Sequence, residues 1–387
     1  MGKIIGIEIR NYGVLKHIQM GKLHRDSLRK ELGSMVAITG ACGSGKSTFA
    51  DVFRFISDAI SSNVEEACNA AHRGGYEQLV SYGSNGPIHF RICCKQDKDS
   101  DPIAYELTIA KERNGRPYVK EESLQQCGEN NEKFLLHLVR GNGFVSIDED
   151  AGRDSLKDPL NGNKEKIELS DIRKLGITIL GEFRNYERIG MFLNFVRSWG
   201  SFRFSDTEVR KMQFSSIIPY LDRTGSNLNS TVYRMCRENP AGFQRVLKSI
   251  QAIMPHITEI APEKYPNGQI FLAFKKEGLD TPIYSQRVSG GILELLAYYI
   301  LLYEGSSRQI FFIDDLDRNL YHKYLSMLVE DMMQVVGTGN ARQLFVSTHS
   351  PFFLNKLKPE QIWMFDVDED CFSVVKQMFD NVAGDNK

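Results

Sequence analysis

The chain has 387 residues, of which 42% are hydrophobic, 25% charged and 10% aromatic, so it can form a sizeable buried core. This composition excludes a disordered chain, a collagen and a coiled-coil rod, and the length allows about two or three domains or one large α/β domain with insertions. With 48 basic and 49 acidic residues, the net charge is −1, so no overall field attracts nucleic acid or anionic lipid. Any such contact needs a local patch.

Cysteine usage and hydropathy indicate the compartment. The seven cysteines form no CxxC pair and no zinc-ligand spacing with histidine, which is typical of reduced thiols. The N-terminal segment alternates like a strand and lacks the apolar run of a signal peptide. The apolar run 292–303 contains Glu294 and is too short to cross a bilayer. We therefore expect a cytoplasmic protein with no membrane-embedded segment.

The first expected elements are two strands, 4–9 and 14–20, which form an antiparallel hairpin. An apolar strand at 35–39 then runs directly into a glycine-rich loop. Helical spacing of the apolar residues in 47–60 predicts a helix immediately after that loop. The N-terminal part therefore predicts a hairpin followed by a strand, loop and helix unit.

The middle of the chain changes character twice. Strands at 88–93 and 103–110 predict an antiparallel sheet, and the Gly-, Asn- and Asp-rich segment 141–166 is interpreted as a mobile connection. Residues 167–260 are expected to be mainly helical, without the heptads of a coiled-coil arm. The helices expected there are 187–199, 227–238 and 242–254.

From residue 290 onward, helices and strands alternate, which is typical of a mostly parallel, buried sheet. Apolar runs that can be buried on both faces support this interpretation. The expected elements are a helix at 290–303, a strand at 309–313, a helix at about 320–335, a strand at 343–347, and strands near 361–365 and 372–376.

Residues 40–47 match the phosphate-binding pattern GxxxxGK[ST] between a predicted strand and a predicted helix. The glycines allow backbone N–H groups to surround a polyphosphate, and the helix N-terminus adds its positive end. Lys46 is expected to reach the β and γ phosphates of ATP, and the Ser47 hydroxyl to bind Mg²⁺. A fortuitous glycine turn is the alternative, but the strand and helix on either side favour the phosphate loop.

The apolar strand 310–313 ends in Asp314 and Asp315. Asp314 is expected to hold Mg²⁺, and Asp315 to orient the attacking water as a base. A core strand followed by a solvated acidic turn is the alternative, which the phosphate loop in the same chain makes less favourable.

Two further motifs, taken alone, are weaker evidence for a phosphate-binding role. Ser289, Gly290 and Gly291 precede a helix, where free N–H groups can take an anion, although such a loop is common. In a dimer, this loop of one subunit can reach the nucleotide held by the other. His349 follows a buried strand and can contact a γ-phosphate, although a lone histidine is more often structural.

In this order and spacing, the four motifs resemble the ABC-type ATPase head shared by SMC, RecF and OLD proteins. The opening IIGIEIRNYGVLKH and the tracts QRVSGGILELLAYYILL and QLFVSTHSPFFL also resemble stand-alone AAA-type ATPases, many of them from prokaryotic defence systems. The likeness covers nearly the whole chain. It implies a Walker A loop, a signature loop at Ser289, Gly290 and Gly291, a Walker B Asp314, catalytic Asp315 and a switch His349. The implied ATP-binding residues of the Walker A loop are Gly40, Ala41, Cys42, Gly43, Ser44, Gly45, Lys46, Ser47 and Thr48.

The implied fold class is α/β, a P-loop NTPase head with a mixed sheet, an N-terminal antiparallel hairpin and a helical insert. We expect an N-terminal ATPase lobe at 1–140, a mobile connection and helical insert at 141–260, and a C-terminal ATPase lobe at 261–387. The implied activity is hydrolysis of ATP with Mg²⁺ in a head-to-head homodimer or higher oligomer. The expected partner is a co-encoded effector protein with nuclease activity, which acts in anti-phage defence or DNA maintenance. The chain itself is expected to contain no nuclease, because only about 20 residues follow the last expected strand of the ATPase and no TOPRIM domain is among them.

The chain departs from this family at two places. Asp315 stands where the family has glutamate, which leaves slow hydrolysis, or a nucleotide-binding scaffold with negligible turnover, as an alternative. The glutamine of the metal-sensing loop is not identified, and Gln78 is only a weak candidate. An ATPase subunit of a membrane transporter is a further alternative. Direct contact with nucleic acid stays open, because the basic stretch 16–30 fits either a phosphate-contacting patch or a solvated loop.

Overall fold

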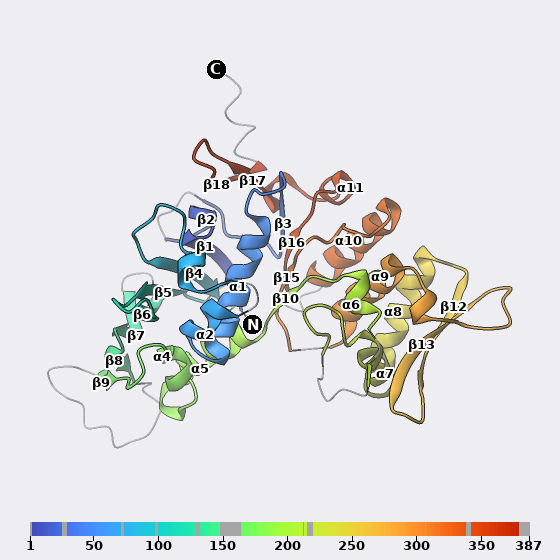
Figure 1. Ribbon diagram of the computed structural model, residues 1–387, viewed down its shortest axis with the longest axis horizontal. Coiled ribbons are helices and arrows are strands. Elements are labelled where there is room, and N and C mark those ends of the chain that lie inside the picture. Colours follow the sequence, from blue (N-terminus) through green and yellow to red (C-terminus); the bar gives the residue numbers. More distant parts are fainter. Residues whose placement is uncertain are drawn as a thin grey trace.

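In the part of the chain that the computed structural model describes, the strands form three sheets, and one long helix lies between the two larger ones (Figure 1). The described residues are 2–24, 29–70, 73–96, 100–128, 132–147, 164–211, 213–214, 220–305, 307–337 and 342–378.

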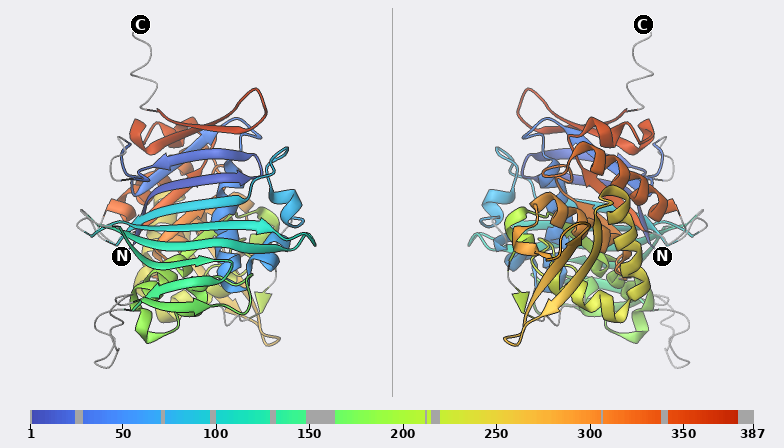
Figure 2. Two further views of the ribbon diagram at one scale, coloured as in Figure 1. Left: turned by 90° about the vertical axis from the view of Figure 1, so that its left-hand side faces the viewer. Right: turned by 90° about the vertical axis from the view of Figure 1, so that its right-hand side faces the viewer.

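Within these ranges, eight strands form an antiparallel sheet in the order β2-β1-β4-β5-β6-β7-β8-β9, which faces the viewer on the left of Figure 2. The predicted N-terminal hairpin is confirmed, since Ile9 of β1 pairs with Ile18 of β2. The strands are β1 Lys3–Tyr12, β2 Leu15–Gly21, β4 Ile88–Lys95, β5 Ile103–Lys111, β6 Pro117–Cys127, β7 Glu132–Val139, β8 Asn142–Ser146 and β9 Lys164–Glu168.

Six other strands of the described ranges form the second sheet, in the order β10-β15-β16-β3-β17-β18. All pairings in it are parallel except that of β17 with β18, so the predicted mostly parallel sheet is confirmed. Carboxyl ends of parallel strands meet at one edge, where the loops after β3, β10, β15 and β16 therefore gather. The strands are β3 Met35–Gly40, β10 Trp199–Phe202, β15 Ile310–Ile313, β16 Gln343–Ser347, β17 Ile362–Val367 and β18 Ser373–Gln377.

A smaller antiparallel sheet packs with several helices at the far end of the molecule, on the right of Figure 1. Its strands are β11 Gln213–Phe214, β12 Ile257–Lys264, β13 Gln269–Lys276 and β14 Ile283–Tyr284. The α-helices of the described ranges are α1 Lys46–Ser61, α2 Val64–Asn69, α3 Tyr76–Leu79, α4 Gly176–Leu180, α5 Glu187–Arg197, α6 Asp206–Val209, α7 Leu228–Glu238, α8 Pro240–Ile253, α9 Gly290–Tyr303, α10 His322–Gly337 and α11 Pro351–Leu354.

Helix α1 lies between the two large sheets and contacts both with aromatic side chains. Phe53 stacks on Phe312 of the parallel sheet, with ring centroids 3.6 Å apart. On the other side, Phe55 packs against Tyr12 and Phe90 of the antiparallel sheet. Because each of these rings is almost fully buried, α1 is held rigidly, and so is the glycine-rich loop that leads into it.

The opposite face of the parallel sheet is covered by the apolar helix α9 and by α10. Strand β3 is buried on both faces, with Val36 and Ile38 toward α1 and Met35 and Ala37 toward the second core. Alternate side chains of a strand point to opposite faces, so a strand covered on both sides needs an uninterrupted apolar run. This explains why the phosphate loop follows such a run.

Two segments differ from the expectations. The predicted mobile connection at 141–166 contains β8 and the start of β9, which pair with each other at the end of the antiparallel sheet, while 148–163 lie outside the described residues. Because β7 also pairs with β8, the sheet continues across the expected boundary at residue 140. The helix expected at 187–199 ends at Arg197, and Trp199 begins β10. In the described part of the chain, no helix is both long and apolar enough to span a membrane.

Candidate functional site

The glycine-rich loop at 40–47 connects β3 to α1, as the sequence predicts. Gly40, Gly43 and Gly45 have φ values of 140°, 81° and 96°, which residues other than glycine rarely adopt. A Cβ at Gly40 would also collide with the carbonyl oxygen of Phe365 in β17. The backbone therefore needs glycine both for its torsion angles and for its close approach to the next strand.

Lys46 is buried, with 8% of its surface exposed, and its side chain folds back across the loop. Its Nζ donates to the carbonyl oxygens of Gly40 at 2.9 Å and Ala41 at 2.7 Å. Burial lowers the pKa of Lys46, while nearby Cys42, Asp315 and Asp314 act in the opposite direction. An ammonium held by neutral carbonyls in this way is available to an incoming polyphosphate, which would stabilise its charge.

Ser47 and Asp314 lie together although 267 residues separate them in the chain. The Ser47 hydroxyl donates to Asp314 Oδ1 at 3.3 Å, and Ser347 at the end of β16 donates to the same oxygen at 2.7 Å. Asp314 is 6% exposed, so its carboxylate is fixed between these hydroxyls at the carboxyl edge of the sheet. The parallel pairing of β15, β16 and β3 produces this convergence.

Asp315 follows directly and has a left-handed backbone with φ of 64°. Its N–H donates to the Ser347 hydroxyl at 2.7 Å, which holds the residue in this uncommon conformation. About a third of its side chain, 31%, is exposed, so the carboxylate can meet solvent beside Asp314.

Arg203 is the residue that sequence reasoning missed at this site. It follows β10, the neighbour of β15, and its guanidinium lies 3.6 Å from Asp314 Oδ2 and 3.3 Å from Asp315 Oδ2. The helix predicted at 187–199 overlaps the first residue of β10, so the strand that precedes Arg203 is not predicted from the sequence. The four residues Trp199–Phe202 do not alternate between apolar and polar and are too few to indicate a strand, so no local pattern points to it.

The loop after β16 is anchored by Asp317. Its carboxylate accepts from the Thr348 hydroxyl at 2.7 Å and from the backbone N–H of His349 at 3.2 Å. The His349 residue is exposed at the same sheet edge as Asp314. The histidine backbone is therefore held in place while its imidazole faces solvent.

The loop at 289–291 begins α9 and lies against a different set of residues. A Cβ at Gly290 would collide with the Asp206 side chain in α6, and one at Gly291 would lie 2.6 Å from the Asn319 carbonyl oxygen. Asn319 in turn donates to the buried Glu294 of α9 at 2.6 Å. Among the described residues, no hydrogen bond joins 289–291 to the phosphate loop, in contrast to Ser47 and Asp314.

The weak candidate Gln78 lies in α3, where its side chain packs beside Gly74. The side chain that the structure brings to the acidic pair is Arg203 instead. In the basic stretch 16–30, Lys16 Nζ lies 4.4 Å from the centre of the Phe372 ring, and Arg25 is outside the described residues.

The chemistry of this donor set fits magnesium and a nucleotide. Carboxylate and hydroxyl oxygens are the ligands that Mg²⁺ prefers, and it takes few protein ligands beside phosphate and water. Ser47 and Asp314 supply such a pair, next to a loop whose glycine torsion angles allow backbone N–H groups to turn toward phosphates. Within the described residues, no group of three or more His, Cys, Asp and Glu side chains offers a separate metal site.

Comparison with protein families matches residues 35–355 to the family described as "AAA domain, putative AbiEii toxin, Type IV TA system". A search of curated proteins found no match. Among solved structures, the chain is similar to an SMC head bound to the C-winged helix domain of ScpA, with 12% identity, a TM-score of 0.54, and coverage of 98% of this chain and 99% of that chain.

Two other SMC heads match with lower TM-scores. One is from Thermotoga maritima, with 11% identity, a TM-score of 0.47 and coverage of 97% and 98%. The other, bound to the C-terminal domain of ScpA from Pyrococcus furiosus, has 11% identity, a TM-score of 0.49 and coverage of 99% and 98%. The first of the three similarities confirms the expected α/β head fold. Because the family match spans most of its length, the chain belongs to this family of AAA ATPases, and it has the ABC-type head fold of SMC proteins.

Proposed function

We propose that the chain binds and hydrolyses ATP with Mg²⁺ at the edge where β3, β10, β15 and β16 end. The contact between Ser47 and Asp314 is the observation that carries this proposal, because it joins the two residues that would share one metal ion. Family membership supports nucleotide hydrolysis in general. The residues proposed to surround the phosphates are Gly40, Ala41, Cys42, Gly43, Ser44, Gly45, Lys46, Ser47 and Thr48.

Each remaining residue has a proposed role. Backbone N–H groups of the loop orient the β and γ phosphates, and the Lys46 ammonium exchanges its carbonyl partners for phosphate oxygens. Ser47 and Asp314 would hold Mg²⁺, which supplies charge neutralisation for the phosphates. Asp315 accepts a hydrogen bond from the attacking water and orients it, and His349 contacts the γ-phosphate.

A Lys46→Ala variant tests the site. The Lys46 ammonium is buried, not exposed, and it also bonds two loop carbonyls, so we expect a folded protein with a locally loosened loop. ATP affinity and phosphate release should both fall by at least about tenfold, since a charge-assisted contact is worth roughly 1.5–3 kcal/mol. Lys356→Ala, which removes an exposed lysine paired with Glu330, is the control. Wild-type binding and hydrolysis in Lys46→Ala would contradict the proposal.

We also propose that two heads close around ATP, with the loop at 289–291 of one subunit facing the phosphate loop of the other. Separation of these two loops within one chain supports this arrangement, because one chain does not bring both to the same phosphate. Rigid-body closure of this kind acts only when a second component responds to it. A co-encoded effector, with nuclease activity, in anti-phage defence or DNA maintenance is the proposed partner. Copurification that is lost in Lys46→Ala tests this, and failure to copurify any partner would oppose it.

A nucleotide-binding scaffold with negligible turnover is the second candidate function. It is favoured by the ion pair between Arg203 and Asp315, which occupies the carboxylate proposed to orient water. Phosphate release by the purified chain, alone and with DNA, separates the two candidates. Saturable ATP binding without release would support the scaffold.

A further inference from the structure

Ser347 ends strand β16 and contacts three consecutive residues of the loop that follows β15. Its Oγ donates to Asp314 Oδ1 at 2.7 Å and accepts from the Asp315 N–H at 2.7 Å. Its backbone carbonyl accepts from the Leu316 N–H at 3.1 Å. Only 5% of Ser347 is exposed, so solvent hardly competes for these contacts. One buried serine therefore touches both acidic residues that are proposed to act on Mg²⁺ and water.

The directions of the two hydrogen bonds of the Ser347 hydroxyl are set by the chemistry of its partners. A hydroxyl has one proton to donate and two lone pairs that accept. The Asp315 backbone N–H can only donate, so it uses a lone pair, and the single hydroxyl proton is left for the Asp314 carboxylate. The orientation of the Asp314 carboxylate and the backbone of Asp315 consequently depend on the same oxygen atom.

A second hydroxyl, that of Ser47, donates to the same oxygen of Asp314 over the longer distance of 3.3 Å. In the proposed function Ser47 binds Mg²⁺, which leaves Ser347 as the one of these two hydroxyls that still holds the carboxylate. The Asp314 N–H donates to the Phe202 carbonyl of β10 at 2.8 Å, which fixes the backbone separately. Ser347 is therefore the hydroxyl that orients the carboxylate of Asp314 toward a bound metal ion.

Asp315 depends on Ser347 through its backbone conformation. Its φ of 64° lies in the left-handed region, which is unfavourable for most residues other than glycine. The hydrogen bond from its N–H to the Ser347 hydroxyl offsets part of that cost. Without this acceptor, the backbone can relax and move the carboxylate away from Asp314. A displacement of about 1 Å at a reacting group can lower a rate by about 100-fold.

A separate set of contacts keeps the two loops together when Ser347 is changed. The Asp317 carboxylate accepts from the Thr348 hydroxyl at 2.7 Å and from the His349 N–H at 3.2 Å. In addition, every residue of β15 is paired with β16. Removing the Ser347 hydroxyl should therefore alter the acidic pair without unfolding this edge of the sheet.

We propose that Ser347 is a positioning residue for ATP hydrolysis. Its hydroxyl orients the Asp314 carboxylate for Mg²⁺ and holds Asp315 in the conformation that orients the attacking water. This inference rests on the proposed function. Ser347 acts through the two acids and not on the phosphates, so its removal should change turnover more than ATP affinity.

Ser347→Ala in the full chain tests this, with phosphate release measured over a range of ATP concentrations. We expect kcat to fall by at least about tenfold, because both hydrogen bonds of the hydroxyl are lost, while KM for ATP changes by less than about threefold. The Mg²⁺ concentration for half-maximal ATP binding should rise by at least about threefold, since Asp314 is no longer oriented. A wild-type kcat together with a wild-type Mg²⁺ midpoint would overturn the proposal.

Ser347→Thr and Ser347→Val separate the hydroxyl from the volume of the side chain. The two replacements have nearly the same shape, and only threonine keeps the hydroxyl. Ser347→Thr should release phosphate at least about tenfold faster than Ser347→Val. Equal kcat values would overturn the proposal, because side-chain volume and not the hydroxyl would then control turnover.

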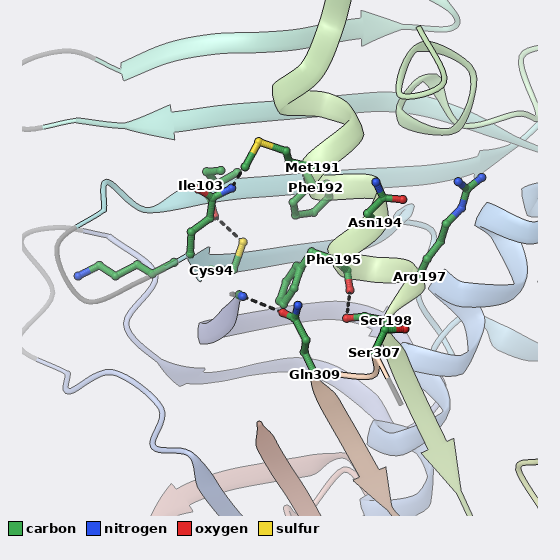
Figure 3. Close-up of a pocket in the computed structure, with 13 residues that line it drawn as sticks. Cys94, Ile103, Met191, Phe192, Asn194, Phe195, Arg197, Ser198, Ser307 and Gln309 are labelled. Atoms are coloured by element: carbon green, nitrogen blue, oxygen red, sulfur yellow. Dashed lines mark hydrogen bonds between the residues drawn. The ribbon is translucent and has the colours of Figure 1, made fainter. Parts of the chain in front are cut away.

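Ser198→Ala is the matched structural control. Ser198 precedes β10 at the amino end of the sheet, opposite to the acidic pair, where it lines a pocket of about 540 Å³ (Figure 3). It is 9% exposed and its hydroxyl donates to the Phe195 carbonyl at 2.6 Å, so its removal also loses a buried hydrogen bond. Ser347→Ala and Ser198→Ala should both lower the urea midpoint, but only Ser347→Ala should lower kcat. An equal fall of kcat in both would overturn the positioning role.

Failure of the proposed hydrolysis gives a different pattern from failure of this inference. Without phosphate release by the wild-type protein, hydrolysis itself is contradicted, and the Mg²⁺ dependence of ATP binding then tests Ser347. A raised Mg²⁺ midpoint in Ser347→Ala, with an unchanged midpoint in Ser198→Ala, would support its role in orienting Asp314. An unchanged midpoint in both variants would overturn that role.

Discussion

Arg203 places a positive charge beside the two acidic residues at the end of β15. Its guanidinium is within 4 Å of both Asp314 and Asp315, on the side where the hydroxyls of Ser47 and Ser347 do not reach. A cation at this position competes with any metal ion for the same carboxylate oxygens. Because the Arg203 side chain is 45% exposed, solvent screens this competition to a small effect.

The Arg203→Ala variant should therefore bind Mg²⁺ more tightly in the presence of ATP. We expect the Mg²⁺ concentration for half-maximal nucleotide binding to fall by a factor of about two to five, which corresponds to the roughly 0.5–1 kcal/mol of an exposed ion pair. A titration with Mg²⁺ at constant ATP measures this, with Arg116→Ala as a control. An unchanged midpoint would mean that Arg203 does not compete for the metal.

At the scale of elements, the buried Glu122 of β6 joins the antiparallel sheet to the start of α4. Its carboxylate accepts from the backbone N–H groups of Gly176 and Ile177 and from the Tyr105 hydroxyl. Burial raises the pKa of Glu122 to about 7, although these hydrogen bonds act in the opposite direction. The folded state therefore holds a proton that the unfolded chain, with an ordinary glutamate pKa near 4.5, releases.

This pKa shift predicts a loss of stability as the pH rises. Below about pH 4.5, Glu122 is protonated in both states; between there and pH 7, only the folded state keeps the proton. The free energy of unfolding should fall by up to about 3 kcal/mol across this window. Glu122→Gln cannot titrate at this position. Its free energy of unfolding, measured with urea, should therefore change less between pH 5 and pH 8 than that of the wild-type protein. An equal change in the two proteins would contradict this assignment.

The contact between the start of α9 and the loop after β15 depends on a glycine. An added Cβ at Gly291 would lie 2.6 Å from the Asn319 carbonyl oxygen, which is backbone and cannot rotate away. Gly291→Ala should therefore lower the free energy of unfolding by about 1–2 kcal/mol, despite the better helix propensity of alanine. Gly337→Ala at the end of α10 is the control, because its Cβ meets open space. Equal stability of the two variants in urea would remove the proposed packing constraint.

At the scale of the whole molecule, the site is expected to be complete only in a dimer. Ser289→Arg introduces bulk and charge where the partner's phosphates would dock, so a monomer should still bind ATP while association and hydrolysis fail. Mixed with Lys46→Ala, it forms dimers in which one site has both Lys46 and Ser289 intact. Phosphate release should return to part of the wild-type rate in such mixtures, compared with each variant alone.

Mixed dimers that are shown to form but stay inactive would argue against composite sites, or would mean that hydrolysis requires two intact sites in one dimer. Size measurements with and without ATP accompany the assay, because recovery of activity has meaning only when mixed dimers form. Ser61→Arg adds the same bulk and charge at an exposed serine, at the end of α1 opposite to the glycine-rich loop, and serves as the control for association.

Local chemistry determined the phosphate loop and the elements beside it. Positive φ angles at Gly43 and Gly45, an apolar strand before them and an amphipathic helix after them are short-range properties, so the residues themselves specify them. The same holds for the alternation of helices and strands after residue 290 and for the acidic end of β15. Catalytic roles for Asp315 and His349 stay predictions.

Only the tertiary structure decided which distant segments meet. Trp199–Phe202 is too short to indicate a strand, and it becomes one because β15 offers a parallel partner and the two cores bury its sides. Arg203 consequently reaches Asp314. Strands β8 and β9 likewise exist through pairing with each other, across a segment whose composition is typical of a loop. Pairing over long sequence separations depends on burial of both partners, and no pattern within either segment encodes it.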